Sequence, residues 1–83
     1  MKIQLKYFAS IREALGQGGE TLEVAAATVG ALRDELIARG GAYAQALSSG
    51  RAVRVAVNQV MAHDATPLTA DAEVAFFPPV TGG

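Results

Sequence analysis

Apolar and polar residues alternate over the first seven positions of the chain. Ile3, Leu5 and Tyr7 fall on one side of an extended backbone, and the polar residues between them fall on the other. A period of two indicates a strand with one buried face. Phe8 breaks the alternation, because it falls on the polar side. Residues 1–8 are therefore predicted to form a half-buried strand that ends in an outward-facing phenylalanine.

A short helix and a second strand are expected next. Ser10 and Glu13 have the spacing of a capping box, in which each side chain bonds the backbone N–H of the other. Gly16 is suited to end this helix in the left-handed conformation. The glycine-rich stretch that follows fits neither a P-loop nor a dinucleotide fingerprint, so we interpret it as a turn. Residues 20–24 then alternate as a second strand.

The longest helix is predicted in the middle of the chain. Thr28 is a suitable N-cap, and the apolar residues that follow recur at helical spacing as far as Ile37. The charged residues between them are expected on the wet side of the helix. Gly40-Gly41 ends it, and a shorter helical segment runs up to Gly50.

The last third of the chain returns to strands. Valines at every second position from 53 to 57 predict a third strand, and Asn58-Gln59 predicts a turn into a brief fourth one. The final strand is Glu73–Phe77, which Pro78-Pro79 ends because proline cannot donate to a ladder. Strands at both ends with one substantial helix between them predict a single α+β domain of two layers.

The composition removes several classes of chemistry. Among 83 residues there is no cysteine and a single histidine, His63. Disulfides, iron–sulfur clusters, thiolate zinc sites and cysteine nucleophiles are thereby excluded, and we expect no bound metal and no bound cofactor. The charge is −1 without a basic stripe, so we expect no nucleic-acid partner. No apolar run is long enough to span a bilayer, and the first residues alternate rather than form a signal peptide, so we expect no membrane partner and a cytoplasmic location.

Two phenylalanines and a methionine are candidates for a docking surface. Phe8 and Phe77 both fall on the outward face at the ends of the first and last strands. If these strands are parallel neighbours, the two rings meet, and Met61 can join them. Exposed aromatic and methionine side chains are typical of protein interfaces. The competing interpretation is that a helix or loop covers them.

The last four residues form a separate unit, so we divide the chain into a domain at 1–79 and a tail at 80–83. Gly82 and Gly83 lack Cβ atoms and could pass through a channel too narrow for other residues. Such a tail delivers a C-terminal carboxyl group to the active site of another protein. The competing interpretation is an ordinary frayed terminus.

The segment 73–83, read as EVAFFPPVTGG, resembles the C-terminus of the small subunits of molybdopterin synthase. The segments YFA with Arg12-Glu13, VNQ at 57–59 and Pro67-Leu68 are similar to the same family, so the resemblance covers nearly the whole chain. One departure is Asp71, which stands where the family has glycine. Aspartate tolerates the left-handed conformation that this turn requires.

The resemblance implies a β-grasp, ubiquitin-like fold: a mixed sheet with parallel, central first and last strands and one main helix on one face. It also implies a sulfur carrier that is not catalytic by itself. An E1-like adenylyltransferase would use ATP to activate the carboxylate of Gly83, and a persulfide protein would supply sulfur to give a thiocarboxylate. The large synthase subunit, in a heterotetramer, would receive that sulfur and pass it to cyclic pyranopterin monophosphate.

The resemblance also implies a role for each candidate residue. Gly83 carries the sulfur and Gly82 gives narrow passage, while Val80 and Thr81 form the extended stem. Phe8, Met61 and Phe77 make the apolar contact with the large subunit. Three other functions stay open: a sulfur carrier for thiazole, cysteine or tungsten-enzyme synthesis, a ubiquitin-like protein modifier, and a plain interaction module.

Overall fold

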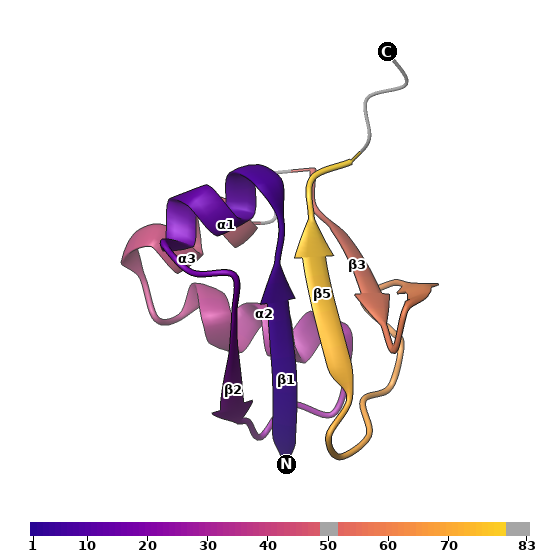
Figure 1. Ribbon diagram of the computed structural model, residues 1–83. Coiled ribbons are helices and arrows are strands. Elements are labelled where there is room, and N and C mark those ends of the chain that lie inside the picture. The colour runs from indigo at the N-terminus through magenta and orange to yellow at the C-terminus, as the bar shows by residue number, and fades with distance from the viewer. Residues whose placement is uncertain (49–51, 80–83) are drawn as a thin grey trace.

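The computed structural model describes residues 1–48 and 52–79, so the tail residues lie outside the described residues. The helix expected to run up to Gly50 ends earlier, at Leu47. Eight elements follow one another along the chain (Figure 1). They are β1 (Lys2–Tyr7), α1 (Ala9–Leu15), β2 (Gly19–Glu23), α2 (Val29–Ile37), α3 (Gly41–Leu47), β3 (Arg54–Val57), β4 (Val60–Ala62) and β5 (Glu73–Phe77). This order is the one predicted from the alternation of the sequence.

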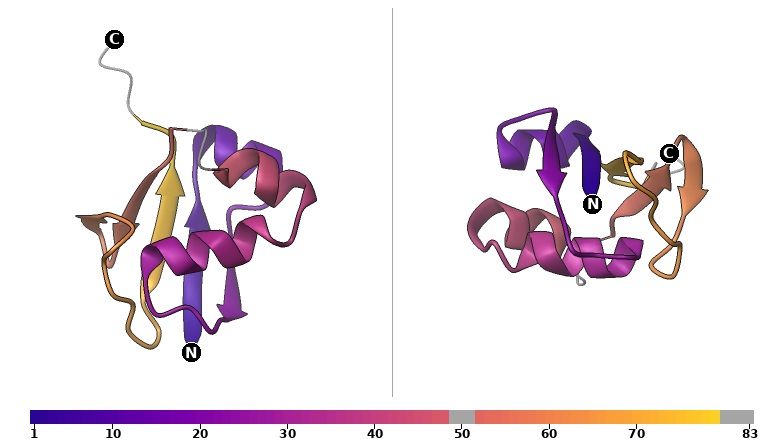
Figure 2. Two further views of the ribbon diagram at one scale, coloured as in Figure 1. Left: turned by 180° about the vertical axis from the view of Figure 1, so that it is seen from behind. Right: turned by 90° about the horizontal axis from the view of Figure 1, so that it is seen from below.

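The strands form one mixed sheet in the order β2-β1-β5-β3-β4. β1 and β5 are parallel and lie inside the sheet, whereas the other neighbours are antiparallel. α2 and α3 cover one face, as the view from behind shows (Figure 2). In Figure 1 no helix passes in front of β1, β5 or β3 on the other face, which we call the open face. The arrangement confirms the β-grasp fold, with two further short helices beside the main one.

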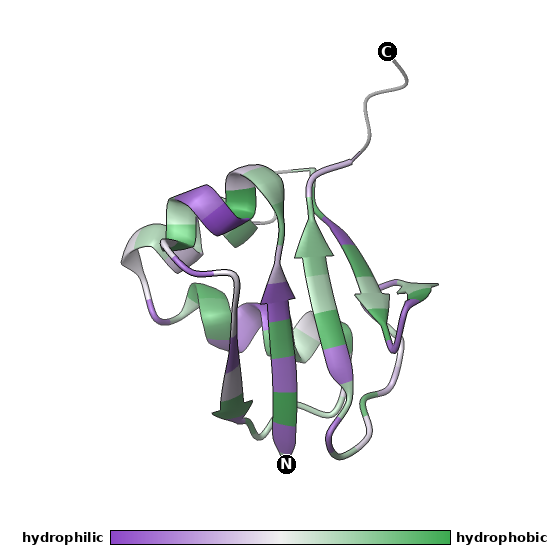
Figure 3. Ribbon diagram, viewed as in Figure 1, coloured by the Kyte–Doolittle hydropathy of each residue, from purple (hydrophilic) through white to green (hydrophobic). Residues whose placement is uncertain are grey.

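The core lies between the sheet and α2. Along β1 every second residue is buried, and Ile3, Leu5 and Tyr7 are at most 2% exposed. Leu32 and Leu36 of α2, at most 1% exposed, belong to the same core. Figure 3 shows that this burial follows the hydropathy of the sequence: hydrophilic (purple) and hydrophobic (green) bands alternate along β1, while β5 is almost continuously apolar. The difference lies on the open face, where β5 carries Ala75 and Phe77 while β1 carries Lys2 and Lys6.

The predicted capping box of the first helix is wrong. Ser10 lies inside α1, whose N-cap is Phe8, and no side chain caps the helix. The helix begins early because Ala9 takes a positive φ of 51° and turns the chain directly after the strand. Gly16 ends α1 in the left-handed conformation, as predicted, and Thr28 caps α2 by accepting from the N–H of Ala31 at 3.2 Å.

Two charged residues of α2 form hydrogen bonds with backbone groups outside their own helix. Arg33 donates to the carbonyl oxygens of Leu47 and Ser48 at 2.6 and 2.8 Å, at the end of α3. Terminal helix carbonyls lack partners within the helix, so this side chain supplies one. Glu35 accepts from the N–H of Ala26 at 2.8 Å. Both side chains lie on the wet side as expected, Glu35 exposed and Arg33 half-buried, and each also bonds the backbone of another segment.

Tight turns fix the ends of the strands. Asn58 and Gln59 have φ of 50° and 68° and connect β3 to β4, as predicted for a two-residue hairpin turn. The Asn58 side chain also accepts from the N–H of Glu73 at 3.0 Å. Asp71 has a φ of 63°, so aspartate does keep the left-handed turn before β5.

A carboxylate joins β1, β2 and α3. One oxygen of Glu20 accepts from the hydroxyls of Tyr7 and Tyr43 at 2.9 and 2.6 Å, and from the Gln17 amide at 3.0 Å. The Arg39 guanidinium lies 5.3 Å from the Tyr43 ring centroid. Burial and the Glu20 carboxylate raise the pKa of Tyr7, and the hydrogen bond to Glu20 raises the pKa of Tyr43. The cluster therefore stabilises neutral tyrosines.

Candidate functional site

The parallel pairing of β1 with β5 brings two phenylalanines to the same edge of the sheet. Tyr7 pairs with Phe76, so the next pair in the same register is Phe8 with Phe77. The Phe8 N–H donates to the carbonyl oxygen of Phe76 at 3.2 Å, which shows that the ladder continues this far. Tyr7 and Phe76 are buried, and the residue after each therefore falls on the open face. The predicted juxtaposition of Phe8 and Phe77 is present.

Large apolar side chains are exposed around this position. Phe8 is 47% exposed and Met61 is 57% exposed, whereas Phe77 is half-buried. In Figure 1 no helix passes in front of β5 or β3 on the open face. Exposed groups of this size are unusual unless a partner covers them.

Two alanines connect the aromatic pair to the methionine. Ala75 of β5 pairs with Ala56 of β3, and Ala56 pairs with Met61 of β4. All three share the open face with Phe77, because alternate residues of a strand point the same way. We call Phe8, Ala56, Met61, Ala75 and Phe77 the docking patch. The small alanine side chains leave a shallow depression between the larger side chains, and its shape is suited to receive apolar groups of a partner.

Val60 does not belong to the docking patch, although it is 69% exposed. It pairs with Val57, which pairs with the buried Val74 and so places Val60 on the core face. Its exposure follows from its position on β4, the edge strand. This alternation also confirms that Met61 points to the open face.

The charged residues next to the docking patch differ in their partners. Lys6 lies 3.8 Å from the carboxylate of Glu73 on the neighbouring strand. Arg54 pairs in register with Phe77 and is exposed. The sequence interpretation did not select Arg54, although its alternation with the flanking valines was a sufficient signal that it faces outward.

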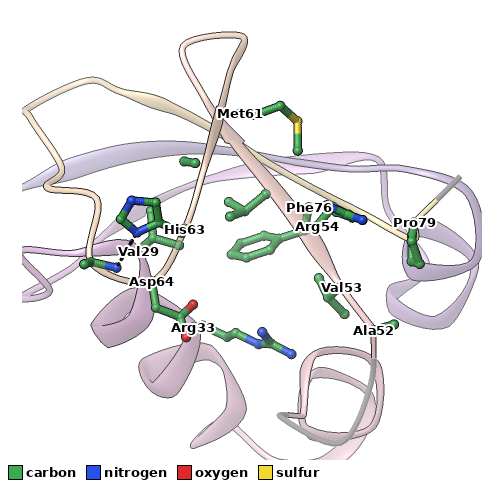
Figure 4. A pocket seen from close by; sticks show the side chains of 13 residues that line it. Val29, Arg33, Ala52, Val53, Arg54, Met61, His63, Asp64, Phe76 and Pro79 are labelled. Atoms are coloured by element: carbon green, nitrogen blue, oxygen red, sulfur yellow. Dashed lines mark hydrogen bonds between the residues drawn. The ribbon is translucent and has the colours of Figure 1, made fainter.

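A groove of about 740 Å³ adjoins the docking patch. Figure 4 shows His63 and Asp64 at one end and Ala52 and Pro79 at the other, with the Phe76 ring between them. His63 Nδ1 accepts from the N–H of Ala65 at 3.2 Å. That contact gives this ring nitrogen a partner within the same turn.

The tail follows directly from the docking patch. β5 ends at Phe77, and Pro78 and Pro79 lead away from it. The tail residues predicted to carry the function, Val80, Thr81, Gly82 and Gly83, lie outside the described residues. The fold therefore starts the tail at the same sheet edge as the two phenylalanines.

The described residues offer little chemistry of their own. Within 1–48 and 52–79, no three His, Asp or Glu side chains are grouped so that they could hold a metal ion. Among the helices the structure describes, none is long and apolar enough to cross a membrane. Among the described residues, the candidate site is thus the apolar surface of the docking patch.

Comparison with known proteins agrees with this geometry. The ThiS family model matches residues 5–83. The molybdopterin synthase sulfur carrier subunits of Escherichia coli and Haemophilus influenzae are 42% and 38% identical over 81 residues, which cover 98% of this chain and 99% of theirs. The structure of SAMP1 from Haloferax volcanii superposes with a TM-score of 0.77 and 30% identity, and each chain is covered in full.

The family follows from the extent of these matches, because both the family model and the bacterial relatives cover almost the entire chain. The shared fold, the docking patch and the Gly-Gly terminus all belong to the matched region. The chain belongs to the ThiS family, together with the sulfur carrier subunits of molybdopterin synthase.

Proposed function

We propose that this chain is the sulfur carrier of a molybdopterin synthase and that Gly83 bears the sulfur as a C-terminal thiocarboxylate. The observation that carries the proposal is the continuity from the docking patch through Phe77 and Pro78 to the Gly-Gly tail. The 42% identity to a molybdopterin synthase sulfur carrier subunit over almost the full length supports the pathway.

The chemistry begins at the carboxylate of Gly83, which is a poor acyl donor. An E1-like adenylyltransferase attaches AMP from ATP and releases pyrophosphate, which gives the carboxyl carbon a good leaving group. The terminal sulfur of a persulfide protein then displaces AMP, and a thiol cleaves the remaining S–S bond to leave the thiocarboxylate. The product is an anionic sulfur nucleophile, comparable to a thiolate.

The domain then presents this sulfur to the large subunit of the synthase. The docking patch binds the large subunit, and Val80 to Gly83 reach into its active site. Residues without a bulky side chain suit a narrow channel, which explains the two terminal glycines. The large subunit supplies the acid and base groups and binds cyclic pyranopterin monophosphate. The carrier itself holds no cysteine that could compete for the sulfur.

Variants of the terminus test this function. Deleting Gly83, or adding one alanine after it, should abolish sulfur transfer in a reconstituted synthase assay and leave the melting temperature unchanged. One alanine added before Met1 is the matched control and should transfer sulfur normally. A C-terminally extended carrier that stays active would refute the thiocarboxylate function.

A ubiquitin-like modifier is the second candidate, because SAMP1 is named a small archaeal modifier protein. In that function Gly83 would form an isopeptide bond with a lysine of a target protein. Immunoblots of cells that express a tagged chain distinguish the two. We expect no ladder of conjugates, and a ladder lost on deletion of Gly83 would favour the modifier.

A carrier for another pathway would share the fold and the tail, so its partner distinguishes it. Affinity purification from the native cell should recover a molybdopterin synthase large subunit. Recovery of a thiazole synthase instead would assign the chain to thiamine synthesis.

A further inference from the structure

Arg54 is an exposed cation without a partner in the described structure. It belongs to β3, where the next residue, Val55, is buried in the core at 7% exposure, so the Arg54 side chain falls on the open face. Within residues 1–48 and 52–79 it makes no side-chain hydrogen bond and no ion pair. By contrast, Lys6 on the same face lies 3.8 Å from Glu73.

Both carboxylates among the open-face strand residues already have a cationic partner: Glu23 lies 3.4 Å from the N-terminal ammonium, and Glu73 lies 3.8 Å from Lys6. The register places Lys2 and Glu23 opposite each other, and Lys6 stands beside Glu73. Among the described residues no carboxylate lies within ion-pair distance of Arg54, so its charge is uncompensated there. It lies at the edge where β1 and β5 end, next to Phe77.

Arg54 also stands between the docking patch and the adjoining groove. It pairs in register with Phe77 of the docking patch, and together with Met61 it lines the adjoining groove (Figure 4). A partner that covers Phe77 and Met61 must therefore remove water from part of the guanidinium. Burying an unpaired ion is strongly unfavourable, whereas a paired and hydrogen-bonded one is tolerated.

We propose that Arg54 pairs with a carboxylate of the large subunit when that protein covers the docking patch, and that this pair determines which partner is accepted. The inference rests on the proposed function. A carboxylate both neutralises the charge and accepts two parallel bonds from the planar guanidinium. Such a pair next to an apolar contact fixes the orientation of the partner, because a misplaced carboxylate leaves both charges without water and without a partner.

Calorimetric titration with the purified large subunit tests the pair. Arg54→Gln should weaken binding at least about tenfold, and Arg54→Glu at least about a hundredfold, since each leaves the opposing carboxylate unpaired. Arg54→Gln should also reduce the salt dependence of the dissociation constant. Arg54 is exposed, so melting temperatures should stay at the wild-type value.

Lys2 provides the matched control, because it lies on the open face at the opposite end of β1. Lys2→Gln and Lys2→Glu change the net charge equally and should bind within about threefold of wild type. If Arg54→Gln bound the large subunit as tightly as wild type, this inference would be overturned while the proposed function would stand. Equal losses of affinity in the Arg54 and Lys2 variants would have the same meaning. A wild-type chain that does not bind the large subunit would overturn the proposed function as well.

Discussion

The backbone N–H of Phe8 donates to the carbonyl oxygen of Phe76 at 3.2 Å, so the parallel ladder of β1 and β5 extends one residue beyond the strand. This bond holds Phe8 beside Phe77 on the open face. The next residue, Ala9, turns the chain away with a φ of 51°. The two phenylalanines of the docking patch therefore lie where the two central strands, β1 and β5, end.

Replacing one member of the patch tests its role in docking. Phe77→Asp should weaken the complex with the large subunit by about 2 kcal/mol or more, because central aromatic residues dominate interface energies. Isothermal titration measures the change. Val60→Asp is the control, since Val60 is 69% exposed but lies on the other face of the sheet. Equal affinities of wild type and Phe77→Asp would contradict the docking patch.

The start of β2 requires glycine at one position. A Cβ on Gly19 would lie 2.6 Å from the carbonyl oxygen of Leu5 on the neighbouring strand. Gly19→Ala should lower the free energy of unfolding by about 1–3 kcal/mol, because backbone must shift to admit the methyl group. At Gly18 the nearest atom is a flexible Arg12 side chain at 3.4 Å. Gly18→Ala should therefore change stability little in urea denaturation, and equal losses at the two positions would contradict the close approach.

The raised pKa of Tyr7 predicts how stability changes in alkali. In the unfolded chain tyrosine ionises near pH 10, about its ordinary pKa, whereas the folded protein holds the Tyr7 proton at higher pH. The stabilisation is thus complete below about pH 10 and is lost as the pH rises above it. Tyr7→Phe removes this titration, so its curve of unfolding free energy against pH should fall less steeply above pH 10. Parallel curves for the two proteins would contradict the assignment.

Much of the fold could be predicted because several signals were local. The alternation at Ile3, Leu5 and Tyr7 defined β1, and Thr28 marked the start of α2. The left-handed turn at Asp71 followed from the resemblance and from the tolerance of aspartate. The capping box at Ser10 failed because the sheet ladder, a long-range interaction, decides where α1 begins.

The candidate site was predictable where it depended on strand alternation and parallel pairing. These placed Phe8, Met61 and Phe77 on one face without any knowledge of the partner. The positions of Arg54 beside Phe77 and of Ala56 beside Ala75 could not be predicted, because they follow from the register of β3 against β5, which depends on the tertiary structure. The hydrogen bonds of Arg33 and Glu35 were not predicted for a related reason, since their backbone partners lie elsewhere in the chain.

Intact-mass spectrometry with fragmentation tests the central claim most directly. The protein is purified from its native cell while the cofactor is being made, and the mass of the C-terminal fragment is measured. We predict a fraction whose mass exceeds that of the unmodified chain by the difference between one sulfur and one oxygen atom, located on Gly83. A C-terminus found only as the carboxylate, in cells that contain the activating enzyme and accumulate the cofactor, would contradict the account.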